Sequence, residues 1–244
     1  ADTDGDGLPD LWETEGYDPD GAGPIPPLDL PGLGADPLRP DVFLELDVME
    51  AVSRPPLPSE PGKAGTIDLV IEGLAQGPVL NPLAADGEPE RASGVALHID
   101  ASGKVPYWQY ISFWSATYPD SSLVNFYELK GAHFDADGNR AEVYHYGIWA
   151  ERESTGATGR SDAETGDDGS GEAVIVGPGN DLIVSLGTYL GTYNAPRTRC
   201  GTLMHELGHN LSLRHGPKAG DAFPESRHSI LSYRWQTRMD MEPA

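Results

Sequence analysis

The stretch PRTRCGTLMHELGHNLSLRH, residues 196–215, decides how the rest of the chain is interpreted. Pro196 suits the first turn of a helix, because its missing N–H would have no intrahelical partner there. The residues that follow keep helical spacing to about Leu211. On such a helix His205 and His209 are four residues apart, so both imidazoles lie on one face and can share a cation. The sequence therefore predicts a metal-binding helix.

The residue after the first histidine indicates how such a metal is used. Glu206 lies one step round the helix, where its carboxylate can reach a water held by the metal without being a ligand. The pattern HELGH is the short zinc-peptidase motif. A third ligand, His215, lies six residues after His209, so the helix must break between them. Three histidines leave a position for water, whereas a structural zinc site usually closes with a fourth protein ligand, so we expect a catalytic zinc with Glu206 as general base.

The complete run at 205–215 resembles the metzincin signature HExxHxxGxxH, with Ser212 in the glycine position. That glycine usually serves a turn with positive φ, which a serine adopts at a cost of about 1 kcal/mol. Downstream, SILSY at 229–233 resembles the metzincin Met-turn, with Leu231 in the methionine place as a hydrophobic floor. By this resemblance Tyr233 matches a tyrosine that approaches zinc in astacin-like and serralysin-like enzymes and stabilises the oxyanion. An ordinary core tyrosine is the alternative.

The resemblance spans roughly residues 41–240. It implies the fold class α/β (α+β), with a metzincin-like twisted mixed sheet, a backing helix, an active-site helix and a small C-terminal subdomain. The N-terminal catalytic subdomain with the zinc helix is expected at 41–215, and a compact C-terminal subdomain with the Met-turn-like segment at 216–244. Residues 1–40 are rich in Asp, Gly and Pro, so we expect an acidic calcium-binding loop and an extended connector there.

Local patterns place the other elements. Alternating residues at 41–49 predict a strand, and apolar residues at helical spacing predict a helix at 66–79. Further strands are expected at 94–100, 141–151, 172–176 and 181–187. The last two are separated by Gly-Pro-Gly-Asn, which predicts a hairpin. An edge strand near 172–177 is expected to bind an extended peptide by backbone pairing.

The N-terminal DTDGDGLPDLWE, residues 2–13, fits the calcium-loop pattern D-x-D-x-D-G-x₅-E. It also resembles the aspartate-rich repeats of thrombospondin type 3. A flexible acidic tail is the alternative, but ligands at such spacing would repel one another without a cation. The expected calcium ligands are the carboxylates of Asp2, Asp4, Asp6, Asp10 and Glu13 and the carbonyl of Leu8.

Other polar and aromatic features have simpler interpretations. The similar-looking segment at 135–139 lacks a closing glutamate, so we expect a turn. The aromatic cluster at 107–114 either lines a substrate cleft or packs in the core. Cys200 is expected to be a small buried residue. Four histidines have no ligand spacing to the main motif and are expected on the surface or in the core: His98, His133, His145 and His228.

Composition excludes some partners. Lys and Arg number 16 against 39 Asp and Glu, a net charge of −23, so nucleic acid would be repelled. No run of about eighteen apolar residues predicts a membrane span, and no signal peptide opens the chain. A secreted, extracellular location is inferred from the enzyme type and the calcium motif alone. A monomer is favoured.

These features together predict a zinc metalloendopeptidase, a hydrolase in which Glu206 assists the attack of water on a protein or peptide substrate. The expected cofactors are Zn²⁺ and Ca²⁺. One alternative is a catalytically weak zinc- and calcium-containing binding or adhesion module. Another is a calcium-dependent structural domain of a larger surface protein.

Overall fold

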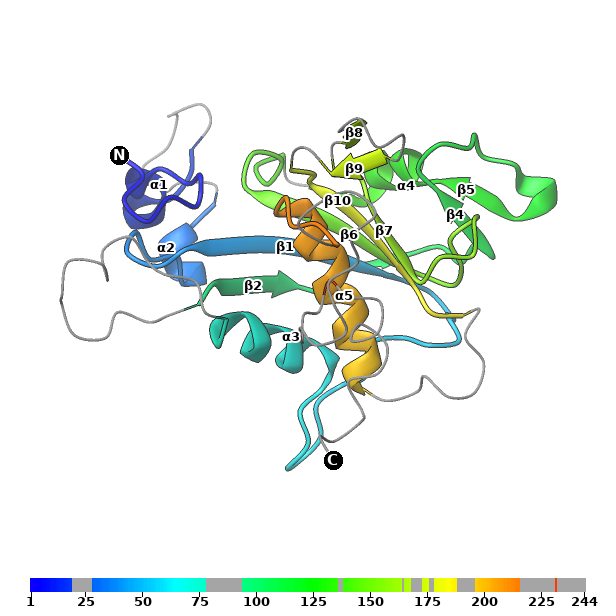
Figure 1. Ribbon diagram of the computed structural model, residues 1–244, viewed down its shortest axis with the longest axis horizontal. Helices are drawn as coiled ribbons and strands as arrows, with labels where there is room; N and C mark the ends of the chain where they lie inside the picture. The colour runs from blue at the N-terminus through cyan, green and yellow to red at the C-terminus, as the bar shows by residue number, and fades with distance from the viewer. Residues whose placement is uncertain are drawn as a thin grey trace. The chain divides into compact units, whose positions relative to one another are not determined.

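The computed structural model describes residues 1–18, 28–77, 94–135, 138–163, 165–167, 173–175, 178–187, 196–215 and 231. A mostly parallel sheet with helices confirms the α/β (α+β) fold class (Figure 1). The α-helices of this part of the chain are α1 Asp10–Glu15, α2 Leu30–Leu33, α3 Thr66–Ala75, α4 Phe126–His133 and α5 Pro196–Asn210, and a short 3₁₀ helix, η2, covers Pro119–Ser121.

The main sheet has the strand order β2-β1-β6-β10-β7, with β3 paired to β1 beside this path. Its strands are β1 Asp41–Met49, β2 Ala96–Asp100, β3 Lys104–Val105, β6 Tyr144–Ala150, β7 Gly159–Ser161 and β10 Asp181–Ser185. Pairing is parallel between β1 and β2, β1 and β3, and β6 and β10, whereas β7 runs antiparallel to β10. The sheet is therefore mixed, and β7 ends the strand order next to β10.

The chain divides into two compact units. The first contains Ala1–Glu45, Ile71–Asp100 and Asp135–His145. Its core includes Phe43 and Leu44 of β1, both fully buried. Charged side chains lie at its margin, where Arg140 Nη1 donates to Glu45 Oε2 at 2.6 Å and to Asp100 Oδ2 at 2.8 Å. Arg140 and Asp100 are partly exposed, whereas Glu45 is buried.

The second unit contains Leu46–Val70, Ala101–Phe134 and Tyr146–Ala244. Its core forms around β6 and β10, where Ile148, Trp149, Leu182 and Ile183 are fully buried. Helix α5 packs against β10 and β7, as Figure 1 shows. Two small parallel strands, β4 Tyr110–Ser112 and β5 Leu123–Asn125, pair with each other and lead into α4.

Most elements follow the sequence patterns. The strand predicted at 41–49 is β1, and the helix predicted from 66 is α3, which ends at Ala75. All nine residues of β1 are buried, not only alternate ones, so both faces of this strand are covered, as is usual for a parallel strand. A turn is predicted at 135–139, where residues 136 and 137 lie outside the described part. The N–H of Gly138 donates to the carbonyl of Asp135 at 2.9 Å, and Asp135 Oδ1 accepts hydrogen bonds from the backbone N–H groups of Asn139 and Arg140.

The predicted hairpin is wrong. The strand at its start, β9 Ala173–Ile175, pairs antiparallel with β8 Thr165–Asp167 in a separate two-stranded sheet. Strand β10 pairs instead with β6 and β7. All five residues of β10 are buried, so the strand belongs between two neighbours of the main sheet, and neither side of it is left for β9.

The connector after the calcium loop is also less extended than predicted. Its residues 19–27 lie outside the described part, but α2 follows at Leu30–Leu33. The Asp29 side chain accepts a hydrogen bond from the N–H of Gly32, and Pro31 occupies the first turn. A capping aspartate and an early proline favour a helix start, so this short helix has a local cause.

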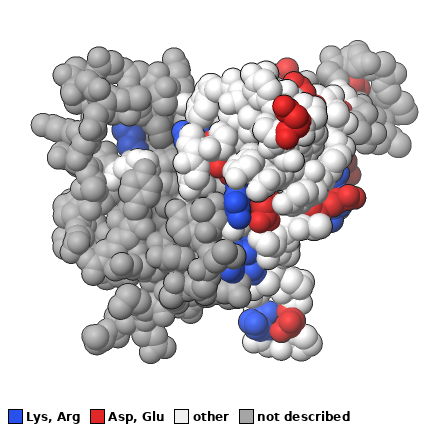
Figure 2. Space-filling view, turned by 90° about the vertical axis from the view of Figure 1, so that its right-hand side faces the viewer, with Lys and Arg blue, Asp and Glu red and all other residues white. Residues whose placement is uncertain are grey.

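Charged side chains of both signs are interspersed on the face shown in Figure 2. Lys63 and Glu60 form an exposed pair at 4.0 Å. The helices of the described ranges include none that is both long and apolar enough to cross a bilayer.

Candidate metal sites

Helix α5 carries the first two histidines of the motif into the interior of the second unit. Cys200, Leu203 and Leu207 are buried on this helix at helical spacing, which confirms the expectation for the cysteine. His205 and His209 are 2% and 5% exposed. A buried imidazole needs a partner for its polar nitrogen atoms, so polar groups or a metal ion must lie next to these two rings.

The three histidines converge on one point. The Nε2 atoms of His205, His209 and His215 lie 3.0 Å from one another in each of the three pairs. Three atoms at that spacing share a point about 2.0–2.1 Å from each, which is the Zn–N distance. The structure thus brings together the residues predicted as zinc ligands.

A hydrogen bond fixes the tautomer of the second histidine. His209 Nδ1 lies 2.8 Å from the carbonyl oxygen of Leu213, and because a carbonyl only accepts, Nδ1 carries the hydrogen. In the neutral ring Nε2 then presents a lone pair. That lone pair can accept from one neighbouring ring but not from both, so hydrogen bonds alone do not account for three equal contacts. Three imidazole nitrogen atoms that converge in this way could hold a metal ion, and they are a donor set that zinc accepts.

The break that returns His215 to the site occurs where the sequence predicted it. Ser212 has φ 65°, in the left-handed region. The N–H of Leu213 donates to the carbonyl of Gly208 at 2.9 Å, and the N–H of Ser212 donates to that of His209 at 2.9 Å. This pair of bonds is a Schellman motif, the common way of ending a helix. The same turn places the Leu213 carbonyl against His209.

Burial also keeps the imidazoles uncharged. It lowers the pKa of His209, an effect that the hydrogen bond to Leu213 partly offsets. Burial and, secondly, the neighbouring His209 lower the pKa of His215 to about 4. Neutral imidazole is the form that binds a metal, so these two rings need not lose a proton at neutral pH.

Glu206, the residue after His205 in α5, is buried, with 5% of its surface exposed. Burial raises the pKa of its carboxyl to about 8, and the charge of Arg160 opposes that shift. Gly159 of β7 lies directly against this side chain, because a Cβ atom at Gly159 would be 2.6 Å from both Cγ and Oε1 of Glu206. Sequence reasoning missed Gly159, since nothing local in its strand shows which helix residue it contacts.

The end of α5 is tied to the same strand. The Ser161 hydroxyl donates to Asn210 Oδ1, and the N–H of Gly179 donates to the carbonyl of Asn210 at 3.1 Å. Arg160, between Gly159 and Ser161, lies over the ring of Trp114 with its Cζ 4.7 Å from the ring centroid. The aromatic cluster at 107–114 is therefore divided, since Ile111 and Phe113 are buried whereas Tyr107 and Trp114 are exposed.

Part of the Met-turn-like segment is described. Leu231 is buried, and its side chain lies against Gly208 of the zinc helix, as expected of a hydrophobic floor. Tyr233 lies outside the described residues, as do His228 and the rest of 216–244. The catalytic role of Tyr233 therefore stays a prediction.

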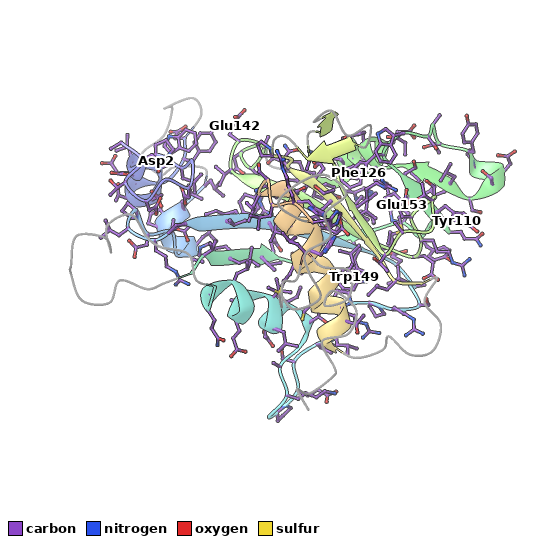
Figure 3. The ribbon with its side chains drawn as sticks, in the orientation of Figure 1. Asp2, Tyr110, Phe126, Glu142, Trp149 and Glu153 are labelled. Carbon is purple, nitrogen blue, oxygen red and sulfur yellow. The ribbon has the colours of Figure 1, made fainter. Side chains whose placement is uncertain are left out.

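The N-terminal loop gathers most of its predicted ligands. Single carboxylate oxygens of Asp2, Asp4 and Asp6 lie within 4.8 Å of one another, and Figure 3 shows Asp2 among the side chains of this region. The N–H of Leu8 donates to Asp6 Oδ1 at 2.7 Å. A second group consists of Asp6, Glu13 and Asp41, again within 4.8 Å.

Two details of this loop differ from the pattern. Asp10 turns to Thr3, accepting hydrogen bonds from its N–H and its hydroxyl, each at 2.7 Å, and it is in neither group of carboxylates. Asp41, the first residue of β1, joins the group instead. The loop pattern ends at Glu13, so it contains no signal for a ligand from a later strand.

The other histidines of the described part are separate from the zinc motif. His98 of β2 stacks on Phe43, with ring centroids 4.4 Å apart, and its Nε2 lies 2.5 Å from Asp41 Oδ1.

No model of a known protein family matches the chain, and no curated protein is significantly similar to it. Inference about function therefore depends on the residues and their geometry.

Proposed function

We propose that the chain is a zinc-dependent endopeptidase that hydrolyses peptide bonds. The observation that carries this proposal is the convergence of three histidine Nε2 atoms at 3.0 Å, beside the buried carboxyl of Glu206. Three protein ligands leave a coordination position for water, and a carboxylate next to that position is what general-base hydrolysis requires. The metzincin resemblance of residues 205–215 supports the same assignment.

In this proposal zinc, when bound by the three imidazoles, supplies a Lewis acid that polarises the scissile carbonyl and lowers the pKa of water. Glu206 accepts the proton of the attacking water and then delivers it to the leaving amine. Gly159 limits where the Glu206 carboxylate can lie, and Leu213 orients the ring of His209. Arg160 favours the charged carboxylate, which is the form that acts as a base.

The substrate is proposed to bind along β7, not along the segment near 172–177. Strand β9 belongs to the separate β8–β9 sheet, whereas β7 ends the order of the main sheet and contacts the zinc helix. An extended peptide added to an edge strand gains backbone hydrogen bonds in any sequence, which suits an endopeptidase. The exposed ring of Trp114, held over Arg160, would flank such a peptide.

The surroundings of the enzyme follow from the same proposal. Protein or peptide substrates, a secreted and extracellular location and a monomeric state fit a peptidase of this type. The net charge of −23 disfavours nucleic acid as a partner.

The experiment is digestion of casein and of a quenched fluorescent peptide library by the purified chain, with zinc content measured on the same sample. We expect hydrolysis that a zinc chelator abolishes and added zinc restores. Glu206→Gln should keep its zinc while the rate falls by about 10²–10⁴-fold. Glu15→Gln, the same change at an exposed helix position, should leave the rate unchanged.

Two results would contradict the proposal. If Glu206→Gln hydrolyses peptides as fast as the wild type, the general base is another group. If the wild type binds zinc stoichiometrically but cleaves nothing, the chain is a zinc-containing binding or adhesion module.

A further inference from the structure

The acidic loop at the N-terminus is joined to the first strand of the main sheet through carboxylates. Asp6 takes part in both carboxylate groups, with Asp2 and Asp4 in one and with Glu13 and Asp41 in the other. Asp6 Oδ2 also accepts a hydrogen bond from the backbone N–H of Asp41 at 2.7 Å. All five residues belong to the first unit of the chain.

Three carboxylate oxygens of this group are buried without a partner among the described residues. They are both oxygens of Glu13 and Oδ2 of Asp4. Glu13 is 1% exposed and Asp4 is 3% exposed. A buried carboxylate without a hydrogen bond or counter-charge is strongly unfavourable, so these groups either bind a cation or take up a proton.

Burial and the repulsion among these carboxylates raise their pKa values. The pKa of Glu13 is raised to about 8, first by burial and then by the charges of Asp6, Asp4, Asp41 and Asp10. The pKa of Asp6 is raised to about 6, again first by burial. Among the described residues, His98 pairs with Asp41, and no Lys or Arg forms an ion pair with this cluster. A bound cation would supply the charge that Asp4, Asp6 and Glu13 lack.

The chemistry and spacing of the donors select the cation. All are carboxylate oxygens, which are hard ligands suited to calcium, and calcium binds oxygen at about 2.3–2.6 Å. Two oxygens on opposite sides of one such ion are therefore about 4.6–5.2 Å apart. The separation of up to 4.8 Å within each group agrees with this geometry.

Hydrogen bonds fix the side chain of Asp41, which lies in one carboxylate group with Asp6 and Glu13. Its Oδ1 lies 2.5 Å from His98 Nε2, and its Oδ2 accepts the N–H of Asp36 at 2.8 Å. Asp10, which the loop pattern predicts as a ligand, is in neither carboxylate group and accepts two hydrogen bonds from Thr3. Its hydrogen bonds close the loop on itself instead.

We propose that Asp41 is a calcium ligand, so that the ion is bound jointly by the loop at 2–13 and by β1 and not by the loop alone. The N-terminal segment is then a calcium-dependent part of the first unit and not a separate linker. This inference does not rest on the zinc peptidase proposal, because it concerns another metal and other residues.

The experiment is calcium titration of the full chain, after removal of calcium and with zinc restored to a constant level, followed by calorimetry and thermal unfolding. Asp41→Asn should weaken calcium binding by at least about tenfold, and its melting temperature should rise less with calcium than that of the wild type. Glu13→Gln should behave in the same way. Glu15→Gln, the exposed control, should bind calcium as the wild type does.

A second comparison distinguishes a ligand from a structural residue. Without calcium, Glu13→Gln should melt at or above the wild-type temperature, because it removes one of several repelling charges and neither Glu13 oxygen has a hydrogen-bond partner among the described residues. A residue that only maintains packing would lower the melting temperature with and without calcium. Zinc content is recorded throughout, so failure of the zinc proposal appears as missing zinc and leaves the calcium result intact.

The proposal is overturned if Asp41→Asn binds calcium with wild-type affinity. It is also overturned if Asp10→Asn loses calcium affinity as the loop pattern predicts while Asp41→Asn does not. If Asp41→Asn fails to fold, loss of calcium affinity in folded Glu13→Gln together with retention in folded Asp10→Asn supports the proposal, and the reverse contradicts it.

Discussion

Replacement of Gly159 by alanine tests whether β7 positions the proposed general base. The added Cβ would lie 2.6 Å from Cγ and Oε1 of Glu206 and 2.8 Å from its Cδ. Non-bonded carbon atoms rest at roughly 3.5 Å or more, so the carboxylate or the strand must move by about 1 Å. Glu206 is buried, which leaves it little room to retreat.

That displacement sets the size of the expected effect. Misplacing a catalytic group by about 1 Å can lower the rate by about 10²-fold, and overpacking a buried site costs about 1–3 kcal/mol of stability. We therefore expect kcat/KM of Gly159→Ala to fall by about two orders of magnitude. Zinc content should be unchanged, because none of the three histidines is among the close contacts of this position.

The assay is peptide hydrolysis together with zinc analysis and urea unfolding on one preparation. Gly131→Ala is the matched control, since a Cβ at Gly131 in α4 meets nothing within 4 Å. Alanine is favoured over glycine within a helix by about 1 kcal/mol, so this variant should keep its activity and not lose stability. Wild-type kcat/KM and unchanged stability in Gly159→Ala would refute the positioning role of β7.

Two further predictions concern Ser212 and Glu13. Ser212→Gly should raise the free energy of unfolding by up to about 1 kcal/mol with activity retained, because glycine adopts the left-handed φ of 65° without strain. Denaturant unfolding measures it, and lower stability would mean that the serine side chain contributes more than its backbone strain costs. In the calcium-free protein, burial and nearby acidic residues raise the pKa of Glu13 to about 8 in the folded state. The folded state then binds more protons than the unfolded state between about pH 4.3 and pH 8, so stability should fall as the pH rises through that range, by at most about 1.4 kcal/mol per pH unit for this group. Thermal melts of wild type and Glu13→Gln across this range isolate its share, and parallel curves would show that Glu13 does not titrate as stated.

The elements that local sequence determines were predicted well. The spacing of His205 and His209 places both on one face of any helix, and the six residues from His209 to His215 require a break, which occurs at Ser212. Strand β1 has the predicted bounds. In these cases the relevant interactions lie within a few residues of one another, so periodicity and spacing are enough.

Long-range pairings could not be predicted in the same way. The hairpin of β9 with β10 was inferred from the short link between them. The buried strand β10 instead pairs with β6 and β7, and nothing in the sequences of β6 and β7 indicates that they pair with β10. Asp41 was missed because it belongs to a strand that begins after α2, far along the chain from the acidic loop that it joins. Gly159 was missed because its contact with Glu206 exists only once β7 and α5 are packed together.

The turn that ends the zinc helix also determines how the site can open. The amides of Ser212 and Leu213 donate the hydrogen bonds of the Schellman motif, while the carbonyl of Leu213 orients His209 and the chain after it carries His215. If this turn unwinds, the last ligand and the support of the second ligand are released in the same event. If the proposed metal is bound, its dissociation and the hydrogen exchange of these two amides would share one local unfolding step, so the stability of this single turn would set how long the ion stays bound.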